Sequence, residues 1–195
     1  MSLISLDFTG AGSEPLPGLM TMSLKSRTTT STEPAVTTGA QLTSTQKGKV
    51  TEQLVASALL IASNGRLAPF VPLADDHGLD LIVLDKVTRR SIAIQVKSAI
   101  ANASRDTVQF DLRKQTYSAA EGEFLLMVVF EPARMGLAAS WLIPMAQVPK
   151  CSTEQADKYA VVPSLKATSN DRCRPYRHDD VRALAAAIQN ELATA

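Results

Sequence analysis

The chain has 195 residues, 45% of them hydrophobic, which suits one domain of ordinary size with a compact core. Its 20 Lys and Arg residues nearly balance its 19 Asp and Glu residues, and the net charge of +1 excludes a strong overall field that would steer it to nucleic acid or a membrane. A nucleic-acid-binding protein of this composition needs its basic residues gathered locally.

The cysteine content and the apolar runs bear on the compartment. Two cysteines, Cys151 and Cys173, are too few for a disulfide framework, and the first residues lack a basic secretory signal. The longest apolar runs, such as residues 124–130, are too short to cross a bilayer. These features favour a soluble cytoplasmic protein with no membrane association. The two cysteines could form a zinc site with His77 and His178, but no closely spaced ligand pair supports one, so structural thiols are the better interpretation.

Residues 1–45 differ in composition from the rest of the chain. The run SRTTTSTEPAVTTGAQLTSTQ is rich in Ser and Thr and has no helical or strand period. Such a segment gains too little from burial to offset the entropy of ordering. We therefore predict a disordered or loosely attached arm over 1–45 and a folded domain over 46–195.

The folded part begins with a predicted helix over 48–65, in which apolar residues recur at helical spacing and Asn64-Gly65 supplies the stop. Glu52 falls at the rim of its apolar arc, where a carboxylate needs a partner or a cation. The later patterns predict, in chain order, an extended piece (68–73), a hairpin of two strands (79–85 and 91–98), a third strand (107–112), a short helix (113–122), two more strands (124–130 and 139–148) and a final helix (178–193). The continuous apolar run over 124–130 is typical of a strand covered on both faces. This order predicts an α/β fold with a mixed central sheet flanked by helices on both sides.

Polar residues in the hairpin suggest a site. Strand alternation places Gln95 and Lys97 on one face of the second strand and the apolar Ile92, Ile94 and Val96 on the other. Counting outward from the turn puts Asp80 at the height of Gln95. Glu52 can join them from the preceding helix. Oxygen ligands from Asp80, Gln95 and Glu52 suit Mg²⁺, with Mn²⁺ as an alternative, and Lys97 can orient a water or offset phosphoryl charge. Hydrolysis of a phosphodiester is the chemistry that uses this combination.

The segments GKVTEQL, HGLDLIVLD and IAIQVKS, in this order, resemble the PD-(D/E)XK nuclease superfamily in its Gln-x-Lys variant. The resemblance implies a restriction-endonuclease-like fold and metal-dependent cleavage of DNA in restriction, repair, recombination or mobile elements. It implies Asp80 as the metal-binding acid, Gln95 as the second ligand position, Lys97 as the catalytic lysine and Glu52 as the accessory acid. Nucleases of this kind often act as homodimers. The departure is Gln95, since an amide supplies oxygen but no charge.

Basic residues cluster at three places and are predicted to bind nucleic acid through phosphate and base contacts. They are Arg89 and Arg90 in the hairpin turn, Arg113 and Lys114 after the third strand, and Arg172, Arg174 and Arg177 around Tyr176.

Other functions stay open from the sequence. Singly, Asp80, Lys97 and Glu52 have ordinary structural explanations, and only their ordered combination favours a nuclease. One alternative is a catalytically inactive protein of the same fold that binds nucleic acid or a protein partner. Another is an interaction module with no nucleic-acid role, which the near-zero net charge favours.

Overall fold

The computed structural model of the chain describes residues 42–73, 78–102 and 104–194. Most of the predicted arm, residues 1–41, lies outside this part. Six strands form the main sheet in the order β1-β2-β3-β5-β6-β9. Their bounds are β1 Leu67–Phe70, β2 Leu81–Asp85, β3 Ser91–Ile100, β5 Glu123–Glu131, β6 Gly136–Pro144 and β9 Arg177–His178. β3 and β5 run parallel, whereas every other neighbouring pair is antiparallel, so the predicted mixed sheet is confirmed.

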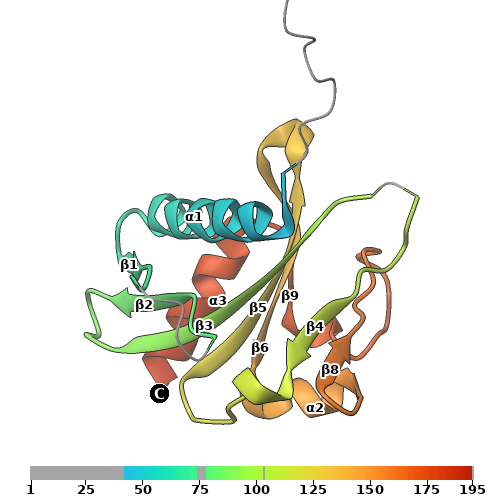
Figure 1. Cartoon of the computed structure of the whole chain (residues 1–195). Helices are drawn as coiled ribbons and strands as arrows, with labels where there is room; N and C mark the ends of the chain where they lie inside the picture. Colours follow the sequence, from blue (N-terminus) through green and yellow to red (C-terminus); the bar gives the residue numbers. More distant parts are fainter. Residues whose placement is uncertain (1–41, 74–77, 103, 195) are drawn as a thin grey trace, which may run out of the picture. The chain divides into compact units, whose positions relative to one another are not determined.

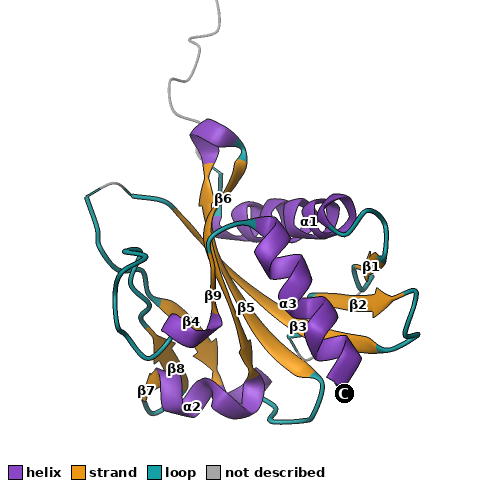
Figure 2. Ribbon diagram, turned by 180° about the vertical axis from the view of Figure 1, so that it is seen from behind, coloured by secondary structure: helices purple, strands orange, loops and turns teal. Residues whose placement is uncertain are grey.

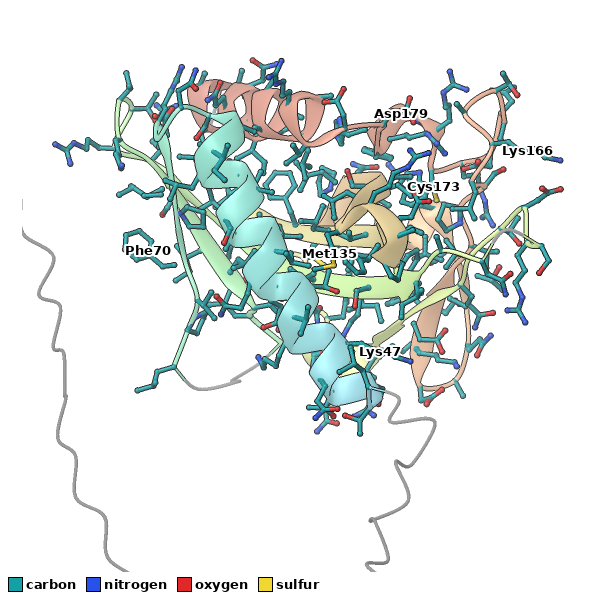
Figure 3. All side chains as sticks on the ribbon, turned by 90° about the horizontal axis from the view of Figure 1, so that it is seen from above. Lys47, Phe70, Met135, Lys166, Cys173 and Asp179 are labelled. Atoms are coloured by element: carbon teal, nitrogen blue, oxygen red, sulfur yellow. The ribbon has the colours of Figure 1, made fainter. Side chains whose placement is uncertain are left out.

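The two long helices, α1 (Ser44–Ala62) and α3 (Val181–Thr194), cover one face of this sheet. Figure 2 shows α3 in front of α1 on that side, and Figure 3 shows α1 crossing the strands with Lys47 near its first turn. Apolar side chains of both helices pack with alternate residues of β2, β3 and β5. Alternation along β3 sends Ile92, Ile94 and Val96 into this core, as the sequence predicted.

The opposite face is covered by a second sheet of three strands, in the order β4-β8-β7 (Figure 1). Their bounds are β4 Phe110–Arg113, β8 Lys158–Val161 and β7 Ser152–Glu154. Phe110 packs against the buried Trp141 of β6, with ring centroids 6.4 Å apart. β5 therefore serves two cores, since Leu126 faces the helices and Leu125 faces the small sheet. Its continuous apolar character, predicted as a strand covered on both faces, is confirmed.

Helix ends follow local capping chemistry. α1 begins at Ser44, four residues before the predicted start, because Thr43 and Gln46 form a reciprocal capping box. It ends at Ala62, and Asn64 (φ 51°) and Gly65 (φ 78°) then reverse the chain as predicted. α3 begins after Asp180, whose carboxylate accepts a hydrogen bond from the Ala183 amide.

One predicted element is wrong, and one predicted strand ends earlier than expected. Residues 113–122 form only one 3-10 turn, η1 (Lys114–Thr116), because tertiary contacts hold the segment extended. The Lys114 amide donates to the Asp157 carbonyl, and Tyr117 packs edge-on against Tyr159 at 5.0 Å. The strand predicted over 139–148 is β6, which stops at Pro144, where helical turns begin.

The remaining short elements are η2 (Pro132–Arg134), η3 (Met145–Gln147), α2 (Val148–Cys151) and η4 (Arg174–Tyr176). α2 contributes to the core on the small-sheet side, so the main sheet has helices on both faces. The two long helices, α1 and α3, lie on the same face. Within the described part of the chain, no helix is both long and apolar enough to span a membrane.

Candidate active site

The hairpin register brings Asp80 beside Gln95. Leu81 pairs with Ile94, and one step further the Asp80 amide donates to the Ile94 carbonyl at 3.1 Å. The Val96 amide in turn donates to Asp80 Oδ2 at 2.7 Å. Because β2 starts at Leu81, no described strand pairs with β3 beyond this point on that side. The carboxylate of Asp80 therefore caps an open strand edge.

The same edge presents a backbone oxygen. Along a strand, the carbonyls of residues two apart point to the same side. Since the Ile94 carbonyl accepts from Asp80 on this side, the carbonyl of Val96 faces it as well. Asp80, Gln95 and Val96 thus offer three kinds of oxygen: carboxylate, amide and backbone carbonyl.

Gln95 is held tightly in place. Its side chain is only 5% exposed, and Nε2 lies 3.5 Å from Thr116 Oγ1, to which it donates. Oε1 is buried and accepts no hydrogen bond from any described residue. A buried polar atom without a partner is costly, and such atoms are uncommon in folded proteins. The amide oxygen is therefore suited to a ligand that enters from the cavity.

Gly78 explains part of this placement. Its φ is +76°, a value that favours glycine, and a Cβ built there would lie 2.5 Å from Gln95 Nε2. The glycine of the sequence GLD thus lets the backbone pass close to the Gln95 amide.

Glu52 reaches the site from α1, although α1 packs on the face opposite Gln95 and Lys97. Glu52 nevertheless lines the same cavity as Gln95 and Lys97. Glu52 is 7% exposed, and its Oε2 lies 2.8 Å from Lys49 Nζ, one turn earlier on the helix.

All four predicted residues line one cavity of about 770 Å³, which lies between α1, the hairpin and the small sheet. Lys97 is half-buried on the same face of β3 as Gln95, and its ammonium makes no hydrogen bond or ion pair with another described residue. The further lining residues are Thr45, Gly48, Lys49, Gly78, Val96, Ser98, Asp111, Arg113, Thr116, Asp157 and Lys158.

The small sheet supplies a charged wall that the sequence did not reveal. Lys158 Nζ lies 2.7 Å from Asp111 Oδ2, and hydrogen bonds from Lys158 and Gln109 lower the pKa of Asp111. Nothing in the sequence indicates that β4 and β8 pair, so this wall could not be predicted. Lys49 was also missed, but its spacing of three residues from Glu52 on a predicted helix was a usable signal.

The predicted nucleic-acid-binding residues are scattered. Arg113 lines the cavity, whereas Lys114 pairs with Glu154 at 2.6 Å and lies over the Tyr159 ring. Arg89 and Arg90 lie at the turn, the opposite end of the hairpin from Asp80. Arg90 Nη1 donates to the Ala193 carbonyl at 3.2 Å.

The three arginines near the C-terminus bind backbone carbonyls rather than line the cavity. Arg172 donates to the Ser152 carbonyl, and Arg174 to the carbonyls of Ala167 and Ser169. Arg177, with its side chain 8% exposed, donates to the carbonyls of Ser164 and Leu165 and lies 5.4 Å from the Trp141 ring centroid. Their guanidinium groups hold loops together, and a role in binding nucleic acid stays a prediction.

The zinc alternative finds no support among the described residues. Cys151 and Cys173 are buried and reduced, and burial raises the pKa of Cys173 to about 12. Burial also lowers the pKa of His178, and His77 lies outside the described residues. No three His, Cys, Asp or Glu side chains in the described part are grouped so that they could hold a metal ion.

No protein-family model matches the chain, and no curated protein matches its sequence. Among solved structures, a bacterial homing endonuclease, I-Ssp6803I, aligns with a TM-score of 0.50. The fold resembles that of this nuclease. The alignment has 18% identity and covers 78% of this chain and 96% of the endonuclease, in agreement with the restriction-endonuclease-like fold expected from the sequence. Hjc, a Holliday junction resolvase from Archaeoglobus fulgidus, also aligns, with a TM-score of 0.37 and 14% identity, over 66% of this chain and 97% of its own.

Proposed function

We propose that the chain is a metal-dependent nuclease that hydrolyses DNA phosphodiester bonds. The observation that supports this most is the convergence of Asp80, Gln95, Lys97 and Glu52 on one cavity. Proteins use such oxygen-rich cavities with a nearby cation for phosphoryl chemistry. A fold shared with a homing endonuclease agrees with the proposal.

The residues present fit a hard divalent cation such as Mg²⁺, or Mn²⁺ in its place. Asp80 supplies a carboxylate, Gln95 Oε1 is a buried acceptor with no described partner, and the Val96 carbonyl faces the same edge. These three would hold the ion together with the Glu52 carboxylate, which lines the same cavity, and all four are oxygen ligands. When bound, such an ion lowers the pKa of a water and polarises the phosphate.

Side chains and backbone groups of the protein would orient the ligands and offset the charge of the phosphate. The Val96 amide fixes the orientation of the Asp80 carboxylate, and Gly78 and Thr116 fix the Gln95 amide. Lys97 would place its ammonium against a non-bridging phosphate oxygen and offset the negative charge that grows as water attacks phosphorus and the P–O bond breaks. Since one cavity cuts one strand at a time, cleavage of both strands of a duplex would take two copies of the chain or two binding events.

The test is cleavage of supercoiled plasmid and of single-stranded DNA with Mg²⁺, Mn²⁺ or EDTA. We expect cleavage that requires metal and falls about a hundredfold or more in Asp80→Asn and in Lys97→Met. Asparagine retains an oxygen that can accept the Val96 amide, so this variant keeps the strand edge capped. Lys166→Met is the matched control, because Lys166 is an exposed lysine that does not line the cavity. Cleavage that survives both site substitutions would rule out this assignment.

A catalytically inactive protein of the same fold that binds nucleic acid is a second candidate. Three observations favour it: Gln95 is uncharged, Glu52 is paired with Lys49, and no three-ligand group of the usual metal-binding types exists among the described residues. DNA affinity that falls with salt but leads to no cleavage under any metal would establish this function instead.

A further inference from the structure

The ion pair of Lys49 and Glu52 lies at the cavity wall rather than on an outer surface. Lys49 Nζ and Glu52 Oε2 are 2.8 Å apart, and both residues line the cavity beside Asp80 and Gln95. The Glu52 side chain is 9% exposed, whereas that of Lys49 is 54% exposed. A nearly buried carboxylate is costly without a cation, and the Lys49 ammonium supplies that cation.

The charge balance of the cavity gives this pair a chemical consequence. The lining residues include four acids, Glu52, Asp80, Asp111 and Asp157, and four bases, Lys49, Lys97, Arg113 and Lys158. Gln95 adds an oxygen but no charge, and the formal charges of the described lining side chains sum to zero. The Asp80 carboxylate attracts a divalent cation that approaches Gln95, whereas the sum of the other lining charges adds no attraction and Lys49 repels the cation.

We propose that Lys49 is an internal counter-cation of Glu52 that competes with a divalent metal ion for that carboxylate. The idea rests on the proposed metal-dependent function and adds a residue that sets how tightly the metal binds. Coulomb repulsion between the two cations is comparable in size to the attraction of each to the carboxylate, so the Lys49 ammonium and an incoming cation compete for Glu52. Because Lys49 is half-exposed, its ammonium can move away into solvent when the cation arrives, and the competition lowers affinity without blocking the site.

The experiment is isothermal titration of the full chain with MnCl₂ at fixed ionic strength. We expect Lys49→Met to bind Mn²⁺ at least tenfold more tightly than the wild type, because Glu52 loses its ammonium partner. Lys49→Arg keeps the charge and should bind as the wild type does. In the double variant Lys49→Met/Glu52→Gln, the gain should disappear, since the carboxylate over which the two cations compete is gone.

Mn²⁺ affinity that is unchanged or weaker in Lys49→Met, or a gain that survives Glu52→Gln, would overturn the proposal. Absence of Mn²⁺ binding by the wild type and by Lys49→Met would overturn it as well. These outcomes are separate from the proposed function, which depends on plasmid cleavage by the wild type. If the wild type cleaves DNA with metal and Lys49→Met does not bind Mn²⁺ more tightly than the wild type, only the role of Lys49 is refuted.

Discussion

Gly78→Ala should damage the site through one contact that can be isolated. The substitution has two costs. The first is the positive φ of +76°, which costs an alanine about 1–2 kcal/mol. The second is the new Cβ, which would lie 2.5 Å from Gln95 Nε2 and force the amide to move. Displacement of this buried amide from Thr116 adds about 1–3 kcal/mol. The free energy of unfolding should therefore fall by about 2–5 kcal/mol in total. The displaced Gln95 oxygen would also leave the position from which it could bind a metal ion.

Gly122→Ala is the matched control, since Gly122 has φ +78° and nothing within 4 Å of a built Cβ. The stability of Gly122→Ala should fall only by the cost of the positive φ, about 1–2 kcal/mol. Urea unfolding followed by the fluorescence of Trp141, the single tryptophan, measures both variants, and plasmid cleavage measures the site. We expect cleavage to fall in Gly78→Ala beyond what its unfolded fraction explains. Equal losses of stability in the two variants, or wild-type cleavage by Gly78→Ala, would refute this reasoning.

Three further predictions concern charge. Arg66 lowers the pKa of buried Asp85 to about 2, so the pair stabilises the fold above pH 4 and loses that effect as pH falls toward 2. Asp85→Asn should thus lose about 2 kcal/mol at pH 7 and little near pH 2 in urea unfolding; an equal loss at both would contradict it. Arg113→Gln should lower the magnitude of the slope of log Kobs for DNA against log salt by about one. An unchanged slope would mean that Arg113 does not contact a DNA phosphate. Arg177→Lys should cost about 1–2 kcal/mol, because an ammonium cannot reproduce its two carbonyl contacts and its stacking on Trp141, and unchanged urea unfolding would oppose this.

The sequence was informative where chemistry is local. Strand alternation and a polar turn placed Gln95 and Lys97 on one face, and counting from the turn placed Asp80 at the height of Gln95. The stop at Asn64-Gly65 follows from residues that accept positive φ. A continuous apolar run identified β5 as a strand buried on both sides.

The sequence was less informative where contacts between residues far apart in the chain determine the structure. The sequence of residues 113–122 resembles that of a short helix. The hydrogen bond from the Lys114 amide to Asp157 and the packing of Tyr117 on Tyr159 hold the segment extended apart from one 3-10 turn. β7 and β8 carry no strong alternation, and β8 pairs with β4, which ends 45 residues before β8 begins, so the second wall of the cavity could not be inferred. The basic cluster around Tyr176 stays a predicted surface for nucleic acid, and the sequence could not show that its guanidinium groups donate to backbone carbonyls.

The open edge of β3 has a consequence for self-association. A strand edge with an unpaired amide is a template on which another chain can add a strand, and proteins protect such edges with charged side chains. Here Asp80 occupies the Val96 amide, and Lys97 adds a charge on the next residue. The residues proposed to cut DNA therefore also keep the sheet from extending into a second molecule. An Asp80→Ala variant, which removes the acceptor altogether, exposes that edge to aggregation.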